Sequence, residues 1–461
     1  DFALFPHKNV FEIKQGVAVS LLRRTAERLA PTEHPVHRSD LFGSDSSKLA
    51  TLVAHTVMNL PAERFRPLPP ELVFAGLDDD RKREYDVYLP IPQIMGQNGD
   101  PAPGIVTTQD EFAISFSKEE QVEKVEALLA TRTEAEAREL FTLCSQNQWI
   151  YADAKRALRS EDWRKELVPI LYRPFDRRWT VYSRYVAVHR RERVSAHLVK
   201  SNNVALITTR QTKDDFAGIA CDTICGHKSG SRFDIGYVFP LWLEPQWPES
   251  RRLPNLSAGA VRDLAGSISL SFVRPGASGE AEGRGDLKAT FGPRDVFDYV
   301  YAVVYSPAYR LRYEDFLKSD FARIPLSPTS RLFRALVGMG SELVALHLLD
   351  CPKLDHAITE YLGRRAPEVE QVTWSKNTVW IDKAETAGFK GVREDVWHFH
   401  IGGYQVCEKW LKDRKGRTLS KDDIAHYQKI VVALAETIRL MKEIDEVIEQ
   451  HGGWPGAFQT S

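Results

Sequence analysis

Cysteine is scarce in this sequence, and the few cysteines are scattered. The 461 residues include five of them: Cys144, Cys221, Cys225, Cys351 and Cys407. An odd and dispersed set does not build the disulfide framework of a small secreted domain, so we expect a reducing, cytoplasmic location. Cys221, Cys225 and the nearby His227 lack the second Cys or His pair that a zinc site needs, so we expect no metal.

Long apolar runs and targeting signals are also missing. No apolar stretch approaches the length of a membrane span, so no membrane partner is expected. The opening DFALFPHKNV has neither a signal-peptide pattern nor an initial Met, and we expect a piece of a longer protein. An excess of one charge is absent too, because 62 Lys and Arg face 63 Asp and Glu. Any binding of nucleic acid must therefore come from a local patch.

Familiar catalytic motifs are absent as well. The sequence has no GxxxxGK phosphate-binding loop, no GxSxG or HExxH motif and no GxGxxG dinucleotide loop. Asp153 and Lys155 share the carboxylate-x-Lys spacing of many nuclease sites, but three-residue matches of this kind arise by chance. His398 and His400 have the spacing of a ligand pair on a strand, although their aromatic neighbours favour a packed polar face. We therefore expect no catalytic residue in this chain and look for binding instead.

Hydrophobic periodicity predicts a mixture of strands and helices. The strand-like stretches are 9–24, 168–183, 197–211, 232–244 and the hairpin-like 371–382. The helical stretches are 44–57, 118–141, 295–320 with a break at Pro307, and 332–349. A long amphipathic helix is expected from about 421 to 450, because Ser420 and Asp423 resemble a capping box and Gly452-Gly453 ends the pattern.

Arginine and aromatic residues gather at 171–193, which reads LYRPFDRRWTVYSRYVAVHRRER, with seven arginines, five aromatic residues and no lysine. Arginine binds phosphate and guanine edges through paired hydrogen bonds, and aromatic rings stack on arginine or on bases. Two interpretations stay open: a nucleic-acid surface, or a β-ribbon whose rings form core while its arginines are solvated or paired with Asp176 and Glu192. Further basic and amide side chains downstream favour the first: Lys200, Asn202, Asn203, Arg210, Gln211, Lys213, His227, Lys228 and Arg232.

Several long phrases together resemble one family. They are YRPFDRRWTVYS, NVALITTRQT, FDIGYVFPLWL, YVYAVVYSPAYRLRYEDFLKSDFARIPL and HFHIGGYQVCEKWLKDRKGRTLS. From about residue 60 to 445 they resemble the C-terminal target-recognition (specificity) region of single-polypeptide restriction–modification enzymes of the type ISP and type IIG groups. In such enzymes a nuclease, and sometimes a helicase, precedes an adenine-N6 methyltransferase, and a target-recognition domain follows.

The first sixty residues are similar to the tail of a gamma-class adenine-N6 DNA methyltransferase fold. The phrase KNVFEIKQGVAVSLL stands where such enzymes carry an aromatic residue that packs on the flipped adenine. The resemblance implies this stacking role for Phe11, because an extruded base must regain the stacking that it loses in the duplex. Glu12 stands where the family has proline, so a plain core position for Phe11 stays open.

The resemblance implies an α+β fold in three parts. They are a methyltransferase tail (1–60), a β-rich target-recognition domain with inserted helices (61–350), and the C-terminal part of that domain with a hairpin and a long helix (351–461). The family's Gly-rich cofactor loop and N/D-P-P-Y/F motif are absent here. We therefore expect the methyltransferase and nuclease domains to act in cis or in trans, with S-adenosylmethionine as the cofactor of the parent enzyme and none in this chain.

The leading hypothesis is sequence-specific recognition of double-stranded DNA, which positions an adenine for N6 methylation or guides cleavage in phage defence. The residues expected to contact DNA are Arg177, Arg178, Arg184, Arg190, Arg191, Arg193, Arg210, Gln211, Lys213, Lys228 and Arg232. Arg173 and Asp176 are instead expected to pair with each other in a structural turn. Two alternatives stay open: a diverged S-adenosylmethionine-dependent methyltransferase or nuclease, and an interaction module that docks a catalytic partner.

Overall fold

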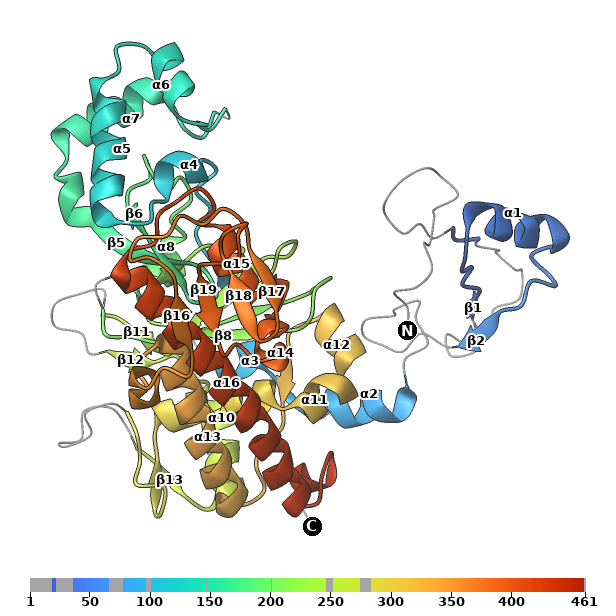
Figure 1. The fold of residues 1–461 in the computed structure, drawn as a ribbon. Coiled ribbons are helices and arrows are strands. Elements are labelled where there is room, and N and C mark those ends of the chain that lie inside the picture. Colours follow the sequence, from blue (N-terminus) through green and yellow to red (C-terminus); the bar gives the residue numbers. More distant parts are fainter. Residues whose placement is uncertain are drawn as a thin grey trace. The chain divides into compact units, whose positions relative to one another are not determined.

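The structure is a computed structural model, and it describes residues 19–21, 36–65, 78–96, 101–145, 147–199, 201–245, 252–273 and 283–459. The chain divides into two compact units, Asp1–Glu84 and Tyr85–Ser461; Figure 1 shows the ribbon. Phe11 and the strand expected at 9–24 lie outside the described residues, so the stacking role of Phe11 stays a prediction. The domain boundaries expected at residues 60 and 350 also stay predictions.

The first unit contains a helix between two short paired strands. Its elements are β1 (Val36–Arg38), α1 (Asp45–Ala54) and β2 (Glu63–Phe65), and the two strands are antiparallel. The Ser44 hydroxyl accepts the backbone N–H of Ser47 at 3.2 Å, and this bond caps the start of the helix. The helix expected over 44–57 is thereby confirmed, with an earlier end at Ala54.

Two small sheets form the centre of the second unit. The four-stranded sheet has the order β4 (Ala102–Pro103), β10 (Gly236–Pro240), β7 (Ala205–Thr209) and β8 (Gly218–Cys221), and its neighbours are antiparallel. The three-stranded sheet has the order β6 (Asp176–Val181), β5 (Leu167–Arg173) and β9 (Ile224–Cys225). β7 is buried at every position, as its apolar run predicts for a strand covered on both faces. The strands predicted within 168–183, 197–211 and 232–244 are confirmed.

Helices cover the β8 edge of the four-stranded sheet. They are α10 (Pro293–Tyr305), α13 (Ser330–Leu348) and α16 (Lys421–Gln450), of which α10 and α13 contact β8 while α16 packs on both helices. The Ala220 N–H donates to the Tyr301 hydroxyl at 3.0 Å, and the Tyr305 hydroxyl donates to the Gly218 carbonyl at 2.8 Å. Two tyrosines of α10 thus satisfy backbone groups at a sheet edge that would otherwise need another strand.

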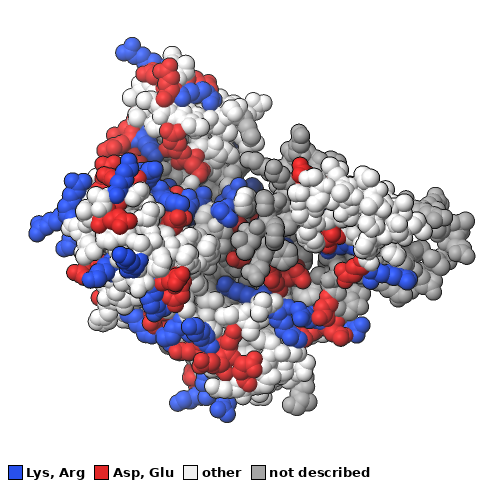
Figure 2. Space-filling view, turned by 45° about the vertical axis from the view of Figure 1, so that its right-hand side comes forward, with Lys and Arg blue, Asp and Glu red and all other residues white. Residues whose placement is uncertain are grey.

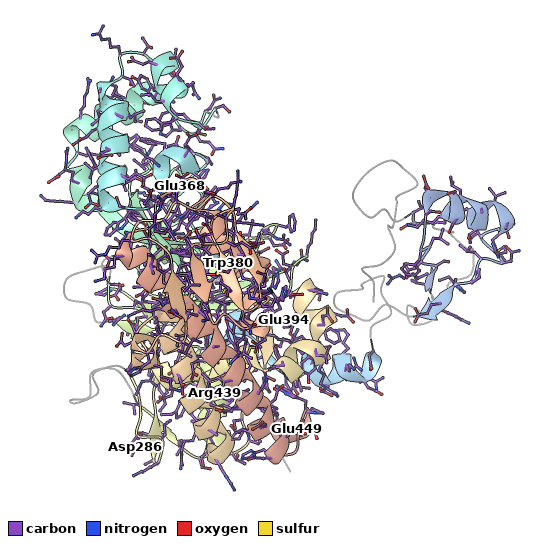
Figure 3. The ribbon with its side chains drawn as sticks, in the orientation of Figure 1. Asp286, Glu368, Trp380, Glu394, Arg439 and Glu449 are labelled. Atoms are coloured by element: carbon purple, nitrogen blue, oxygen red, sulfur yellow. The ribbon has the colours of Figure 1, made fainter. Side chains whose placement is uncertain are left out.

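The long C-terminal helix α16 is confirmed at its expected bounds. The Ser420 hydroxyl accepts the Asp423 N–H at 3.0 Å, and the Asp423 carboxylate accepts the Ser420 N–H at 2.9 Å, which completes the capping box. Arg439, which projects from α16 in Figure 3, forms an ion pair with Glu342 of α13 at 2.7 Å. This pair lies at the surface beside a buried apolar contact between the two helices.

A helical subdomain with its own apolar core lies at the top of Figure 1. It comprises α4 (Asp110–Ala113), α5 (Lys118–Ala130), α6 (Glu134–Leu140), α7 (Tyr151–Ser160) and η3 (Trp163–Glu166). The single helix expected over 118–141 is wrong, because the chain leaves α5 at Ala130 and starts α6 at Glu134. The Thr133 hydroxyl accepts the Glu136 N–H at 3.2 Å, and such side-chain bonds favour a new helix start over continuation.

A further four-stranded sheet and several short elements complete the chain. The sheet has the order β16 (Glu360–Leu362), β19 (Gly388–Lys390), β18 (Thr378–Trp380) and β17 (Thr373–Ser375). The hairpin expected at 371–382 is confirmed, and its turn residues Lys376 and Asn377 have φ of +49° and +57°, as in a type I′ turn. Small, mostly antiparallel sheets mixed with helices confirm the α+β class.

The break expected at Pro307 is also confirmed, because α10 ends at Tyr305 and a new helix starts at the proline. The remaining short elements are α2 (Asp79–Asp86), β3 (Leu89–Pro90), α3 (Ile91–Ile94), β11 (Trp242–Leu243), β12 (Leu253–Pro254), α9 (Ala258–Ile268), β13 (Ser271–Phe272), β14 (Thr290–Phe291), α11 (Pro307–Arg312), α12 (Glu314–Ser319), β15 (Arg323–Ile324), η4 (Pro352–Asp355), α14 (Glu394–Trp397), α15 (Val406–Lys412) and η5 (Gly456–Phe458).

Candidate nucleic-acid interface

Two loops meet at one end of the four-stranded sheet. β7 ends at Thr209 and β10 begins at Gly236, and these residues are opposite each other in the antiparallel pair. The loop that leaves β7 (210–217) therefore lies beside the loop that enters β10 (226–235). We call these two segments the loop pair. It carries five of the residues expected to contact DNA: Arg210, Gln211, Lys213, Lys228 and Arg232.

A buried carboxylate holds the loop pair together. Asp214 is 8% exposed, and its Oδ2 accepts the Ser231 hydroxyl at 2.7 Å and the Arg232 backbone N–H at 3.0 Å. The Lys213 backbone N–H donates to Asp234 Oδ2 at 2.8 Å and forms a second link. Hydrogen bonds to a carboxylate are among the stronger polar contacts in proteins, so the two loops keep a fixed backbone relative to each other.

A hairpin from far along the chain supports the loop pair. Its strands are β20 (His400–Ile401) and β21 (Tyr404–Gln405). At its turn, a Cβ on Gly403 would lie 2.2 Å from Asp214 Oδ2. A Cβ on Gly402, whose φ is +56°, would lie 1.9 Å from the Gly230 carbonyl oxygen. Glycine at both positions lets the turn approach the loops this closely.

The polar side chains of the loop pair lie mostly at the surface. Four of the five are exposed: Arg210, Gln211, Lys213 and Arg232. Arg210 pairs with Asp320 at 2.9 Å, and both side chains stay about half exposed. Lys228 is half-buried, and its carbonyl accepts the Tyr404 hydroxyl at 2.9 Å. The structure thus brings these five residues to one end of the sheet, and their contact with DNA stays a prediction.

Four more of the expected contacts follow the β5–β6 hairpin, near α8 (Glu192–Ser195): Arg184, Arg190, Arg191 and Arg193. Arg184 and Arg191 are exposed, and Arg191 adopts a left-handed φ of +51° at the start of α8. Arg190 is half-buried and pairs with Glu192. The β-ribbon interpretation of 171–193 expected an arginine to pair with Glu192, and Arg190 forms this pair.

Arg193 lies apart from the loop pair. It is exposed and lines a cavity of about 490 Å³ together with Pro240, at the end of β10. The loop pair joins the opposite end of that strand, at Gly236. The predicted contacts therefore do not form one continuous cluster along the strand.

Charges of both signs share the face of the molecule that Figure 2 shows. On the face turned forward in Figure 2, Lys and Arg are interspersed with Asp and Glu. This distribution agrees with the net charge of −1. Attraction to a polyanion therefore depends on individual loops, not on a field of one sign.

Arg178 belongs to a buried ion-pair network and not to the exposed surface. It is 9% exposed and pairs with Asp176 at 2.8 Å and with Asp413 at 3.2 Å. Arg414 pairs with Asp176 at 2.9 Å, and its guanidinium carbon lies 3.4 Å from the centroid of the Trp410 ring. A guanidinium enclosed in this way does not reach a phosphate or a base edge, so we assign Arg178 a structural role in place of the expected DNA contact.

The charge of Asp176 is stabilised by its two arginine partners. Burial raises the pKa of this carboxyl, but the guanidiniums of Arg414 and Arg178 outweigh burial and hold the pKa below its ordinary value. Each carboxylate oxygen accepts from one of these arginines. Asp176 is therefore ionised in the interior of the folded protein at neutral pH.

The expected side-chain pair of Arg173 and Asp176 is wrong. The two residues lie opposite each other in the backbone of the β5–β6 turn, which confirms the turn. The Arg173 side chain instead donates to the Tyr172 carbonyl at 2.8 Å and lies 4.1 Å from the Tyr172 ring centroid. The neighbouring Arg177 is exposed and pairs with Asp222 at 2.8 Å.

Sequence reasoning missed the residues that hold the loop pair in place. Asp214, Ser231 and Gly403 come from three separate segments, and no local pattern relates them. The phrase HFHIGGYQ does contain paired glycines, which signal a tight turn. What that turn contacts becomes visible only in the folded chain.

The other sequence candidates have ordinary surroundings. The five cysteines are all buried and unpaired. Asp153 forms an ion pair with Arg156, and the Lys155 ammonium contacts the Thr131 carbonyl. Among the described residues, no three His, Cys, Asp or Glu side chains gather as metal ligands would. No helix of the described part is long and apolar enough to cross a membrane.

Fixed loops that present basic side chains from one end of a sheet are typical of recognition domains, in which a rigid scaffold positions binding loops. Residues 100–443 match the family described as the Type ISP C-terminal specificity domain. The chain belongs to this family. No curated protein matches the sequence.

Solved structures share the fold. One is a nuclease-deletion mutant of the Type ISP restriction–modification enzyme LlaGI in complex with a DNA substrate mimic, with 18% identity and a TM-score of 0.61 over 89% of this chain and 33% of that chain. A DrdV–DNA complex has 18% identity and a TM-score of 0.64 over 87% and 42%. The ATP-dependent Type ISP restriction–modification enzyme LlaBIII bound to DNA has 13% identity and a TM-score of 0.60 over 87% and 26%. The chain spans less than half the length of each of these proteins.

Proposed function

We propose that this chain recognises a specific sequence in double-stranded DNA as the specificity part of a restriction–modification enzyme. The observation that carries the proposal is the match of residues 100–443 to the Type ISP C-terminal specificity domain. The fold likeness to proteins whose structures contain DNA agrees with it.

The chemistry of the loop pair suits this function. Exposed arginine and lysine side chains bind phosphate, and arginine also reads guanine through paired hydrogen bonds. The amide of Gln211 has the donor and acceptor that adenine requires in the major groove. Because Asp214 fixes the backbone of both loops, the loop backbone needs little ordering when DNA binds.

The catalytic steps belong to domains outside this chain, in cis or in trans. Those domains would methylate adenine N6 with S-adenosylmethionine or cleave DNA, guided by recognition. The sequence has neither the Gly-rich cofactor loop nor the N/D-P-P-Y/F motif of such methyltransferases. The residues of this chain therefore do not fit the cofactor, and we assign them recognition alone. No observation favours a diverged enzyme or an interaction module instead.

Selection from a random duplex library tests the proposal. The chain is mixed with the library at modest salt, and the bound fraction is sequenced. We expect one asymmetric site to be enriched. Salt-sensitive binding without an enriched sequence would limit the chain to phosphate affinity and contradict specific recognition. Absence of binding would contradict DNA recognition by this chain altogether.

A matched pair of double variants locates the binding surface. Lys213→Ala with Arg232→Ala removes two exposed charges from the loop pair, whereas Arg156→Ala with Lys165→Ala removes two from the helical subdomain, where the side chains are 78% and 79% exposed. We expect the first variant to lose affinity by tenfold or more and the second to bind like the unaltered chain. Equal losses in both variants would show that binding does not depend on the loop pair.

A further inference from the structure

An aromatic ring is exposed at the tip of the loop pair. Phe233 is 61% exposed and Ile235, two positions further on, is 44% exposed. Single exposed apolar side chains are common on proteins, but these two stand together among basic residues of a candidate DNA surface. The Arg232 guanidinium carbon lies 5.3 Å from the Phe233 ring centroid.

The backbone beneath this ring is fixed. The hydroxyl of Ser231, a residue that is 1% exposed, accepts the Phe233 N–H at 3.2 Å and the Asp234 N–H at 2.9 Å. The same hydroxyl donates to Asp214. These bonds fix the backbone from which the Phe233 side chain extends.

The polar side chains of this segment bond within the loop pair, whereas its apolar side chains do not become buried. Arg232, whose side chain stays 58% exposed, donates to the Asp214 carboxylate at 3.4 Å, and Asp234 accepts the Lys213 N–H. Phe233 and Ile235 occupy the intervening positions and are exposed. The loop therefore exposes two apolar side chains between charged neighbours.

We propose that Phe233, with Ile235 beside it, inserts between base pairs of the bound duplex as an apolar wedge. This inference rests on the proposed function. Phenylalanine and isoleucine are among the side chains that partly unstack a base step, and a ring gains by stacking on the base that it contacts. The arginine and lysine side chains of the same loops bind the phosphate backbone of the DNA while Phe233 acts on the bases. Phe233 therefore adds specificity, because base-pair steps differ in how easily they are unstacked.

The test uses the duplex site enriched by selection and a random duplex of equal length. Phe233→Ala should bind the selected site about tenfold more weakly, with an unchanged dependence on salt, because an apolar contact releases no counterions. Arg232→Ala should instead lower the salt slope by about 1. Phe233→Trp should restore most of the affinity. Leu140→Ala removes another exposed apolar side chain, 50% exposed in α6, and should leave binding unaltered.

Insertion has its own optical readout. We place 2-aminopurine at successive adenines of the selected site and measure its fluorescence, which rises when the base loses a stacking neighbour. The unaltered chain should raise the signal at one step, and Phe233→Ala should not. If the unaltered chain binds no duplex, the proposed function fails. If it binds while Phe233→Ala keeps its affinity, or binds without any change in fluorescence, the wedge is refuted and the proposed function stands.

Discussion

At the scale of single residues, Asp176 shows how this fold accommodates charge in its interior. Its carboxylate is 1% exposed and lies between Arg178 and Arg414. Removal of one partner from a buried ion pair leaves the opposite charges uncompensated, which costs about 3–5 kcal/mol. We expect Asp176→Asn to lower the free energy of unfolding by roughly that amount at pH 7, measured by urea unfolding. Asp162→Asn, in an exposed pair with Lys165, should change it by at most about 0.5 kcal/mol.

The effect of Asp176 should disappear in acid. Its folded pKa lies below the unfolded value of about 3.9, so the ionised carboxylate stabilises the fold fully above that value. The stabilisation is lost as the pH falls through the folded pKa. We therefore expect the difference in melting temperature between Asp176→Asn and the unaltered chain to be constant from pH 7 to 5 and to shrink below pH about 4. A difference that stays constant down to pH 3 would contradict the assigned ionisation.

Lys213 separates phosphate contact from loop structure. Its backbone N–H takes part in the link to Asp234, but its side chain is exposed. Lys213→Ala should therefore leave the loops in place and remove one phosphate contact. We expect weaker binding to every duplex and a salt slope that falls by about 1, read from affinities at several salt concentrations. A loss confined to the selected sequence would show a base contact instead.

Residue roles were only partly predictable from the sequence. The basic character of the loops is evident from composition, and so is the structural nature of the YRPFD turn. The burial of Arg178 is not, because its enclosure depends on Asp413, which lies 235 positions away. Arginines of one stretch therefore look alike in sequence while Arg178 is buried and Arg184 is exposed.

At the scale of elements, the β20–β21 turn is a support for the loop pair. A Cβ on Gly403 would collide with the Asp214 carboxylate. Gly403→Ala should therefore displace the turn and loosen both loops, with faster hydrogen exchange at 210–217 and 226–235 and weaker DNA binding. Gly266→Ala, in α9 where a Cβ meets no atom within 4 Å, should leave exchange unaltered and stabilise the helix by about 0.5–1 kcal/mol. Unchanged exchange in Gly403→Ala would contradict the supporting role.

His347 connects three helices through a fixed proton arrangement. Tyr301 of α10 lies 2.6 Å from His347 Nδ1, and Thr437 of α16 lies 2.9 Å from Nε2. The Tyr301 hydroxyl accepts the Ala220 N–H, so its proton is directed to Nδ1, while Thr437 donates to the Ala433 carbonyl and accepts from Nε2. A neutral imidazole satisfies every partner. A second proton on the imidazole would lie on Nδ1 and would point at the hydroxyl proton of Tyr301, which disfavours the charged form.

The consequence is a loss of stability in mild acid. Burial, and secondarily the charge of Arg310, lowers the pKa of His347 to about 3. The unfolded chain binds a proton near pH 6.5 and the folded chain does not, so stability falls as the pH drops below that value. Between pH 7 and 5 this amounts to about 2 kcal/mol. The stability difference between the unaltered chain and His347→Gln, measured by urea unfolding at both pH values, should shrink by that amount, and a difference that stays constant would contradict the assigned neutral imidazole.

Elements with strong local signals were predicted well. α16 has a capping box, a sustained apolar stripe and a glycine end, and it was placed correctly because each signal lies within the helix itself. The division of α5 from α6 depends on Thr133, whose cap competes with a helical pattern that continues across it. Short strands such as β20 and β21 depend on distant packing, and periodicity over two residues carries no information about them.

At the scale of the whole molecule, balanced charge limits nonspecific attraction to DNA. With a net charge of −1, affinity for a random duplex comes from a few local contacts. Such binding weakens steeply with salt, whereas the selected site keeps its base contacts. We expect random duplex to be released near physiological salt while the selected site stays bound, as measured by fluorescence anisotropy. Release of both at the same salt concentration would contradict base-specific recognition.

The assembled surface itself could not be read from the sequence. The loop pair joins segments around 210 and 230 to a turn at 402, and the sheet register decides that they meet. Resemblance to a family supplied the class of the domain, and the fold and family match agree with it. Neither supplied the base sequence that is read, because outward side chains, not the fold, determine it.

In the loop pair, the residues that set the backbone differ from those that form the exposed surface, and this difference has an evolutionary consequence. Asp214, Ser231 and Gly403 set the backbone, while the exposed side chains at 211, 213 and 233 take no side-chain part in that framework. Mutation can therefore exchange the outward side chains one at a time without unfolding the loops. If the loop pair reads DNA as proposed, such single exchanges change the base sequence that is preferred while the backbone of the loops is kept.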